Sequence, residues 1–339
     1  MWLTSSSIGR KLVMAITGVC LVLFVTFHVL MNAVAIFWPV AYNQVCEFLG
    51  ANWYALVASL GLALLFTIHI IYACWLTIQN RNARGNDRYA VTSRPPQVEW
   101  SSKNMLVLGI VVLAFLVVHL IQFWAKMQLQ EIVSHDPACW ESVNGAPAAP
   151  VFGTLFIQLA FQQIWTPIVY IIGFVALWFH MNHGFWSMFH TIGWDSNIWI
   201  KRLKTIGCWW TSIVIALFII QAVVFTVKAN NNFYTTDIAL QEQYGEFWGE
   251  KAQAAIENFQ AQATEQFKDA DPNDQWGQIE FLTTKGAEFV KEAALIDSCF
   301  TKQCPDVTVP EMSELRQFKV NIERNVKYAE TLKNNQPAQ

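Results

Sequence analysis

Four histidines occupy long apolar stretches of this sequence, one in each stretch. They are His28, His69, His119 and His180, and His183 follows the last of them by three residues. A titratable side chain at membrane depth is costly, so it usually has a bound partner and a function. Imidazole nitrogen ligates metal ions and haem iron. The chemistry available to these residues therefore depends on whether the histidines meet.

Their depth in the membrane follows from the helical rise of about 1.5 Å per residue. Counted from the cytoplasmic end of each span, His28 lies roughly 24 Å deep and His119 roughly 22 Å deep, whereas His69 and His180 lie roughly 14 Å deep. The four sort into an outer and an inner level, and each level draws on two helices. This arrangement predicts two b-type haems with different surroundings and hence different reduction potentials. His183 fits the inner level equally well, and depth does not choose between it and His180.

The plainer interpretation is that each histidine only bonds to a neighbouring helix, as single histidines in spans often do. Four histidines on four spans, matched in depth by pairs, favour shared cofactors instead. A haem-free anchor or transporter, in which the histidines bind substrate or protons, is the alternative. His190 and His135 are expected to be solvated or interfacial. Small residues would let a macrocycle approach the backbone, and the candidates are Gly18, Gly61, Gly109, Gly173 and Gly184.

The composition predicts the scaffold that positions these residues. The chain has 339 residues, of which 54% are hydrophobic and 14% charged, and its net charge of −3 gives no basic surface for nucleic acid. Each of five apolar segments is long enough to cross a bilayer, which takes about 20 residues. They are residues 12–37, 53–78, 104–125, 164–189 and 205–227. We expect an all-α membrane protein in which the first four spans form the haem-binding bundle. Tryptophans near the ends predict interfacial anchors, namely Trp38, Trp53, Trp100, Trp124, Trp165 and Trp209.

The orientation follows from the charges of the connecting loops. Basic residues gather on one side of the membrane, and they are Arg10, Lys11, Arg81, Arg84, Arg88, Arg94, Lys103, Lys201, Arg202 and Lys204. The loops of the other side hold Lys126 and little else. The N-terminus is therefore predicted to be cytoplasmic, and five spans carry the C-terminus outside. In a bacterium the chain would lie in the inner membrane with a periplasmic tail.

The chain is predicted to have two parts, a membrane domain at 1–228 and a helical periplasmic extension at 229–339. The extension is polar and patterned as three helices, at about 236–268, 274–299 and 310–332. A surface helix at 152–163 is expected before the fourth span. The extension could cover the outer haem, seal a quinone exit, bind a periplasmic partner or only add stability. Outside the cytoplasm Cys299 and Cys304 would form a disulfide, and Cys46 with Cys139 is a second candidate pair.

The runs around the histidines resemble a known family. They are Phe27-His28-x-x-x-Asn32, Ile68-His69-x-x-Tyr72, Val118-His119-Leu120 and Phe179-His180-Met-Asn-His-Gly184-Phe-Trp186-Ser187. With five spans and histidines on the first four, the chain resembles the dihaem cytochrome b subunit of succinate:quinone and quinol:fumarate reductases, in its single-polypeptide, five-helix form. The run Asn-Arg-Asn-Ala-Arg-Gly-Asn-Asp-Arg-Tyr89 is similar to the version in anaerobic Bacteroides-like bacteria. The resemblance covers about residues 1–228.

The resemblance implies that His28 and His119 bind the outer haem and that His69 and His180 bind the inner one. The family's His-x-x-x-Gly pattern selects His180 over His183. It also implies a flavoprotein subunit with FAD and an iron–sulfur subunit on the cytoplasmic face, and it admits a dimer of the complex. This chain has neither a dinucleotide fingerprint nor a cysteine set for an iron–sulfur cluster. It would carry the quinone-reactive haems of the enzyme but no dicarboxylate catalysis.

Further residues are candidates for the quinone and for the haem propionates. The resemblance places menaquinone or menaquinol near the outer haem, where Asn32, Glu47 and Gln122 are the polar candidates, although Glu47 could equally be a solvated loop residue. Propionates favour basic partners, and the inner-side candidates are Arg10, Lys11 and Lys201. Some dihaem fumarate reductases carry a proton-conducting glutamate two residues before the histidine of the fourth span. Trp178 stands there in this sequence, so a proton route of that form is doubtful.

The resulting expectation is a membrane anchor that passes electrons between menaquinol and an iron–sulfur partner. Menaquinol oxidation coupled to fumarate reduction, a reaction of anaerobic respiration, is the first choice, and succinate oxidation would use the same parts. A cytochrome b of a formate dehydrogenase or hydrogenase is a further alternative. Those cytochromes differ in the number and placement of histidine-bearing spans.

Overall fold

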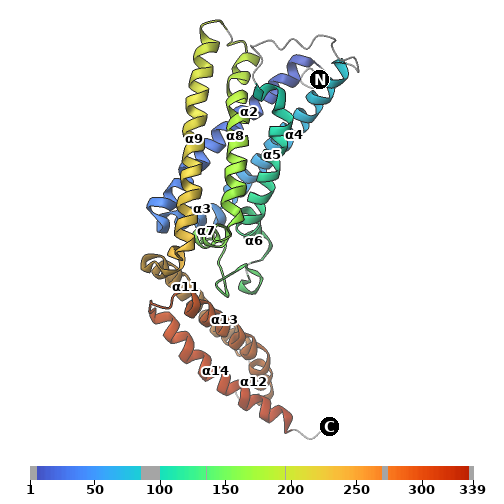
Figure 1. Cartoon of the computed structure of the whole chain (residues 1–339). Helices are drawn as coiled ribbons and strands as arrows, with labels where there is room; N and C mark the ends of the chain where they lie inside the picture. The colour runs from blue at the N-terminus through green and yellow to red at the C-terminus, as the bar shows by residue number, and fades with distance from the viewer. Residues whose placement is uncertain (1–5, 85–99, 135, 195, 269–273, 336–339) are drawn as a thin grey trace. The chain divides into compact units, whose positions relative to one another are not determined.

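Five long apolar helices dominate a computed structural model of the chain, which describes residues 6–84, 100–134, 136–194, 196–268 and 274–335 (Figure 1). Each is long and apolar enough to cross a membrane. They are α2 (Ser7–Phe37), α4 (Trp53–Arg84), α5 (Trp100–His119) with its continuation η1 (Leu120–Trp124), α8 (Trp165–Thr191) and α9 (Trp199–Asn230). The expected all-α, multi-pass membrane architecture is confirmed at this level.

The ends of α2 show how the sequence sets helix boundaries. The hydroxyl of Ser6 accepts the backbone N–H of Gly9 at 2.9 Å and caps the helix before its apolar run begins. The helix ends at Phe37, because Pro39 cannot donate a helical hydrogen bond and instead opens the next helix, α3 (Pro39–Ala51). Helix α9 begins six residues before the predicted residue 205, since its basic first turns form helix readily although they are not apolar.

The four helices that carry the predicted ligand histidines pack around one another, and α9 lies against two of them. Helix α2 packs against α4, α8 and α9, and α8 also packs against α5 and α9, whereas α4 and α5 approach each other over only a short stretch. Side chains of α9 bond to backbone carbonyls of α2: Gln221 Nε2 donates to Val29 O at 2.7 Å and Lys228 Nζ donates to Ile36 O at 2.8 Å. These bonds satisfy polar groups that have no water to bind in lipid.

The predicted surface helix at 152–163 is instead a buried one. Helix α7 (Gly153–Phe161) follows the connection after α6 (Gln128–Val133), and Phe156 is fully buried. Gln158 Nε2 donates to Ala229 O at 2.7 Å, and the side-chain oxygen of Asn43 accepts from both N and Oγ1 of Thr154 at 3.0 and 2.9 Å. The expectation of a surface helix was wrong because this helix has no polar side chains other than Thr154 and Gln158, and a helix that is apolar on nearly all sides is typically buried.

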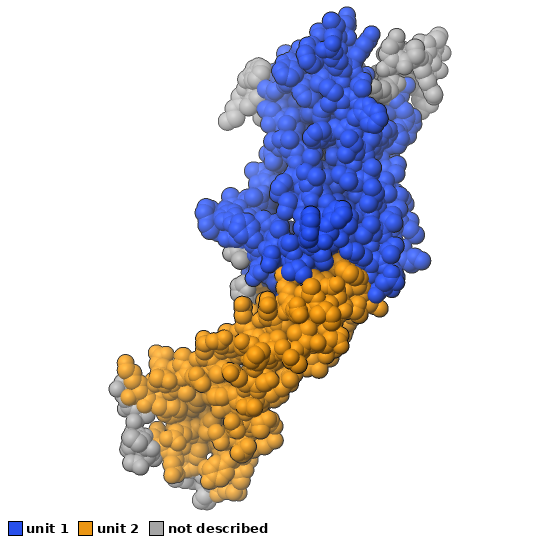
Figure 2. All heavy atoms as spheres, turned by 90° about the vertical axis from the view of Figure 1, so that its left-hand side faces the viewer, with its two compact units in different colours: residues 1–133, 150–231 blue, residues 134–149, 232–339 orange. Residues whose placement is uncertain are grey.

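The chain divides into two compact units, which Figure 2 colours separately. Unit 1 comprises residues 1–133 and 150–231, and unit 2 comprises residues 134–149 and 232–339. The division differs from the predicted boundary at 228/229 mainly in the loop between the third and fourth spans. That loop belongs with the C-terminal helices, whereas the prediction left it with the membrane domain.

The reason is a β-hairpin in this loop. Strand β1 (Ser142–Val143) pairs with β2 (Ala146–Pro147) through a turn in which Asn144 and Gly145 have φ values of 53° and 79°. Asn-Gly is the sequence that such a tight turn favours, because both residues tolerate the left-handed region. Lys302 Nζ donates to Gly145 O and Gln303 Nε2 donates to Pro147 O, each at 2.6 Å. The hairpin is therefore fastened to the C-terminal helices by hydrogen bonds.

The C-terminal part of unit 2 is mostly helical, and residues 304–309 form a non-helical connection between its last two helices. After the short η2 (Pro137–Cys139) of the loop, it contains α10 (Phe233–Thr236), α11 (Ile238–Gln266), α12 (Gln275–Phe281) with the π turn η3 (Leu282–Gly286), α13 (Ala287–Gln303) and α14 (Pro310–Asn334). Asp237 and Asp274 cap α11 and α12 by accepting the N–H groups of Leu240 and Gly277. Trp248 is fully buried and its indole N–H donates to Gln303 Oε1 at 2.8 Å.

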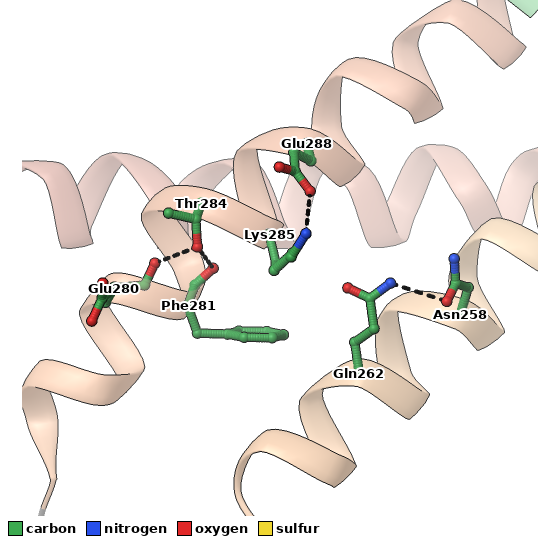
Figure 3. Close-up of polar contacts among 7 residues, drawn as sticks. All are labelled: Asn258, Gln262, Glu280, Phe281, Thr284, Lys285 and Glu288. Atoms are coloured by element: carbon green, nitrogen blue, oxygen red, sulfur yellow. Dashed lines mark hydrogen bonds and ion pairs between the residues drawn. The ribbon is translucent and has the colours of Figure 1, made fainter. Parts of the chain in front are cut away.

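The second predicted tail helix is interrupted where η3 joins α12 to α13. Figure 3 shows the polar contacts beside this π turn: Thr284 Oγ1 donates to Glu280 O at 2.7 Å, and Lys285 pairs with Glu288 at 2.8 Å. Within α11, Gln262 Nε2 donates a hydrogen bond to Asn258 Oδ1 at 3.0 Å. All these partners lie three or four residues apart on exposed helix surface, where such pairs contribute a few tenths of a kcal/mol, roughly 0.2–0.5. This cluster has the character of a solvated helix surface.

All seven cysteines lie in the described part of the chain, and all are free thiols. The predicted disulfide between Cys299 and Cys304 is thus not formed in this structure. Cys46 and Cys139 belong to different units, and their pairing stays a prediction. Cys299 lies within α13, whereas Cys304 is the residue at which the helix ends, with a non-helical φ of −128° and ψ of 54°. Both thiols are buried, and burial raises the pKa of Cys299 to about 11.

Candidate functional site

The outer-level histidines His28 and His119 face each other across the bundle. Their ring centroids lie 5.8 Å apart and their planes are inclined at 84°. His28 comes from α2 and His119 is the last residue of α5 before the π turn η1. The ring of Phe24 stacks on His28 at 5.4 Å, and that of Phe115 lies 6.1 Å from His119. Two imidazoles therefore oppose one another inside an aromatic enclosure.

The inner-level histidines His69 and His180 form a second facing pair. Their ring centroids lie 6.3 Å apart and their planes are inclined at 65°. His69 comes from α4 and His180 from α8, so the two pairs use all four histidine-bearing helices. The structure thus brings together the two pairs expected from the sequence, and it places His180, which depth alone did not distinguish from His183, opposite His69. Haem binding by these pairs stays a prediction.

The spacing of both pairs suits one metal atom between two imidazoles. A metal–nitrogen bond to imidazole is about 2.0–2.1 Å, and the nitrogen lies about 1 Å from the ring centre. Two rings that bind opposite faces of one iron then have centroids about 6 Å apart, close to the observed 5.8 and 6.3 Å. Among the described residues there is no cluster of three or more metal-binding side chains, and a bis-histidine haem site needs only two.

The distance between the two levels can be measured along two helices. On α2 the inner level is marked by Thr17, which contacts His69, and the outer level by His28, which is about 16 Å of helix further on. On α5 the inner level is marked by Gly109, which lies beside His180, and the outer by His119, about 15 Å further on. The two estimates agree, so the pairs form two separate sites stacked along the bundle.

Two of the four histidines have a hydrogen-bond partner that fixes their tautomer. The Nδ1 of His69 lies 3.1 Å from Thr17 Oγ1, whose own proton is directed at the carbonyl of Val13, 2.9 Å away. The Nδ1 of His119 lies 3.2 Å from the hydroxyl of Tyr170. In each case Nδ1 donates and leaves the Nε2 lone pair for a metal. Outer partners of this kind orient metal-binding histidines generally.

In the part of the chain that the structure describes, His28 and His180 have no such hydrogen bond that would leave Nε2 free to bind a metal. Asn32 Nδ2 lies 3.1 Å from His28 Nε2, and Asn32 Oδ1 accepts from the hydroxyl of Tyr42 at 3.3 Å. Binding of iron at that nitrogen would require His28 to release Asn32. The Nδ1 of His180 is buried and has no hydrogen-bond partner among the described residues. Within the described chain, His180 therefore has no partner at Nδ1 of the kind that Thr17 gives His69 and Tyr170 gives His119.

The glycines predicted to admit a macrocycle separate into distinct groups. A Cβ on Gly18 would lie 4.0 Å from His69 Cε1, and one on Gly109 would lie 3.7 Å from His180 Cε1, so both glycines border the inner pair. Gly173 instead accommodates the ring of Phe115, which would clash with any side chain there. Gly61 and Gly184 have open space beside them, with nothing within 4 Å of an added Cβ. Gly173 is thus assigned to helix packing, contrary to expectation.

The three basic residues predicted to meet propionates differ in their surroundings. Arg10 lies over the indole of Trp75 at 5.4 Å, a cation–π contact that holds the guanidinium close to the bundle. It is seven residues, or two helical turns, from Thr17 and lies on the same face of α2. Lys11 and Lys201 are exposed. Of the three, Arg10 has the placement that best suits the inner pair.

Two further residues of the fourth span are accounted for by their neighbours. The ring of His183 lies 4.9 Å from the indole of Trp186, over which Lys204 Nζ sits at 4.1 Å. Trp178 donates its indole N–H to Ser212 Oγ at 3.0 Å and thereby joins α8 to α9. His190, at the end of α8, is exposed, and His135 lies outside the described residues.

Two of the three quinone candidates, Asn32 and Gln122, border the outer pair of histidines, and Glu47 is exposed. Asn32 lies between His28 and Tyr42, as described above. Gln122 lies in η1, where its Oε1 accepts from Tyr170 at 2.9 Å and its Nε2 donates to Thr166 at 3.2 Å. Glu47 is exposed on α3. The amides of Asn32 and Gln122 therefore already bond to residues around the outer pair.

A residue that the sequence analysis missed is Glu131 on α6. Its carboxylate lies against the backbone of Gly50, and its Oε2 is buried without a hydrogen-bond partner among the described residues. Burial, reinforced by the negative charge of Glu47, raises the pKa of Glu131 from the ordinary 4.5 to about 7. Such a carboxyl exchanges a proton near neutral pH. Its only sequence signal was a lone acid in a short polar run directly after a span.

Comparisons of the chain with protein-family models, curated proteins and solved structures found no match.

Proposed function

We propose that this chain is the membrane-anchor cytochrome b subunit of a quinol:fumarate reductase or succinate dehydrogenase, and that it holds two b haems. The observation that carries the proposal is the pair of opposed imidazole sets, His28 with His119 and His69 with His180, at separations that suit one iron each. Four unrelated packing histidines would have no reason to pair in this way at two levels.

The haems supply reversible one-electron transfer between ferric and ferrous iron. The chain's own residues bind, orient and insulate them. Thr17 and Tyr170 hold the rings of His69 and His119 with Nε2 available. Phe24 and Phe115 line the outer pair with apolar surface, which excludes water and contributes to the reduction potential there. Gly18 and Gly109 leave the backbone open beside the inner pair.

The placement of two sites about 15 Å apart along the helices supports a route for electrons across the membrane. The outer pair would exchange electrons with menaquinol or menaquinone and the inner pair with an iron–sulfur subunit. That subunit and a flavoprotein with FAD would dock on the cytoplasmic side. The basic residues at the helix ends predicted to face that side, among them Arg81 on α4 and Lys103 on α5, suit such a docking surface. Menaquinol oxidation with fumarate reduction is the proposed direction, and the chain itself carries no dicarboxylate chemistry.

The proposal is tested by purifying the chain with its native partners. The expected result is a complex with a flavin subunit and an iron–sulfur subunit. Its haem, followed by absorbance, should be reduced by a menaquinol analogue and reoxidised by fumarate. Copurification with formate dehydrogenase or hydrogenase subunits would assign the cytochrome to a different enzyme. Purified protein without haem would overturn the proposal and favour a haem-free anchor or transporter.

A further inference from the structure

A chain of three polar side chains leads away from His119 Nδ1. The hydroxyl of Tyr170 lies 3.2 Å from that nitrogen and 2.9 Å from Gln122 Oε1, and Gln122 Nε2 donates to Thr166 Oγ1 at 3.2 Å. Gln122 presents its oxygen to Tyr170, so the single phenolic proton is donated to Gln122. The phenolic oxygen is then an acceptor, and His119 must donate to it through Nδ1–H.

The position of Tyr170 is fixed by its surroundings. The residue is only 4% exposed. The rings of Phe115, Phe161 and Phe174 surround it at centroid distances of 5.0, 5.2 and 5.9 Å. Edge-on aromatic contacts of this kind stabilise one ring orientation. The hydroxyl therefore has one place to point, and the ring can lose its oxygen without losing its packing.

The inner level has a simpler arrangement that serves as an internal comparison. Thr17 accepts from His69 and bonds back to the carbonyl oxygens of Val13 and Met14 on its own helix, at 2.9 and 3.1 Å. No further side chain takes part among the described residues. The acceptor for His69 is thus set by a single helix, whereas the acceptor for His119 depends on η1 and α8 together.

We propose that Tyr170 is the positioning residue for the outer-level ligand His119, and that Gln122 orients its hydroxyl for that task. The pair fixes His119 as the Nδ1–H tautomer and aims its Nε2 lone pair at the iron. The inference depends on the proposed haem function. It also assigns Gln122 a role other than the direct quinone contact expected from the sequence, because its oxygen and one amide proton are already engaged.

The consequence is a measurable difference between the two haems. An acceptor on Nδ1–H makes imidazole a stronger electron donor and so favours ferric iron. Loss of the acceptor should raise the reduction potential of that haem alone. The test is a redox titration of the complete complex, combined with low-temperature electron paramagnetic resonance, for Tyr170→Phe and for the matched inner-level variant Thr17→Val. Haem content is measured in each variant.

Tyr170→Phe is expected to retain both haems, raise the potential of one component and change its resonance signal. Thr17→Val is expected to raise the reduction potential of the other haem, the one at the inner level. If Tyr170→Phe assembles poorly, Gln122→Leu serves as the second variant, with a smaller shift of the same component as Tyr170→Phe. Wild-type protein without haem would overturn the proposed function itself. Two haems with unchanged potentials and signals in both Tyr170→Phe and Gln122→Leu would overturn only the positioning role, as would equal shifts of both components.

Discussion

The imidazole of His69 lies with its centroid 6.3 Å from that of His180, although the two residues come from different helices, α4 and α8. The same relationship recurs at 5.8 Å between His28 and His119. Membrane helices have little use for facing imidazoles as packing groups, because each ring brings polar atoms that lipid cannot satisfy. A group held between the rings would satisfy the nitrogen atoms that it binds, and the proposed function depends on this geometry.

Substitution of His69 or His180 by alanine should remove the inner haem and spare the outer one. Each change would delete one of the two histidines proposed to hold that haem, so the haem content is expected to fall from two per chain to about one. The measurement is a haem count on purified protein. His183→Ala is the matched control, because this ring lies against Trp186 and should leave both haems in place. Loss of haem in His183→Ala with retention in His180→Ala would exchange the assignments of these two residues.

A bulky side chain at Gly109 should have the same effect by a different route. An added Cβ would lie 3.7 Å from His180 Cε1, so the longer side chain of Gly109→Leu would push against the ligand ring. Haem content should fall toward one per chain while the protein still inserts into the membrane. Gly61→Leu is the control, since nothing lies within 4 Å of a Cβ there. Equal haem content in the two variants would show that the space beside His180 is not needed.

The four histidines of the candidate site show which features the sequence could predict and which it could not. Apolar length gave the five spans, and a rise of about 1.5 Å per residue was enough to place His28 and His119 at one level. For the partner of His69 it left His180 and His183 open, and only the family resemblance selected His180. Ring orientation could not be predicted, because Thr17 and Tyr170 come from other helices than the histidines they contact. Contacts of this kind depend on helix rotation, which hydropathy does not encode.

Other features were present in the sequence but were not used. The mostly apolar run of α7 predicts burial, and Asn144-Gly145 predicts a hairpin turn. The π turns η1 and η3 have no comparable signal, since they arise where tertiary packing inserts a residue into a helix. The pKa of Glu131 depends on its burial against Gly50 and on Glu47, which only the folded chain brings together.

Glu131 should make the stability of unit 1 depend on pH. Its pKa rises from 4.5 to about 7 on folding, so the folded state binds the proton more tightly. The contribution of protonated Glu131 to the free energy of unfolding is fully present below pH 4.5 and is lost as the pH rises through about 7. Because the carboxyl is partly exposed, the free energy of unfolding falls by about 2 kcal/mol over this range. Thermal unfolding in detergent at several pH values measures it.

Glu131→Gln mimics the protonated carboxyl and should flatten this pH profile, so that the variant unfolds at a higher temperature than the wild type at pH values above about 7. Glu47→Gln is the companion variant. It removes the nearby charge and should shift the wild-type transition to lower pH without abolishing it. Identical pH profiles for the wild type and Glu131→Gln would contradict the assignment.

Among the residues that fasten the hairpin in unit 2, Gln303 should be the one whose substitution destabilises it most. It accepts from Trp248 at 2.8 Å and donates to Pro147 O at 2.6 Å. Gln303→Ala leaves both partners unsatisfied, which should cost about 2 to 4 kcal/mol. Hydrogen exchange of residues 142–147 in the full-length protein should accelerate. Gln253→Ala, which loses only an exposed bond to Glu257, should change little, and equal effects of both variants would refute this role for Gln303.

The central claim is tested most directly by counting and titrating haem in the purified chain. The account predicts two b haems per polypeptide, both with the spectrum of bis-imidazole ligation, reduced in two separate one-electron steps. Protein that folds and inserts but contains no haem would contradict it, and so would iron ligated by anything other than these four histidines.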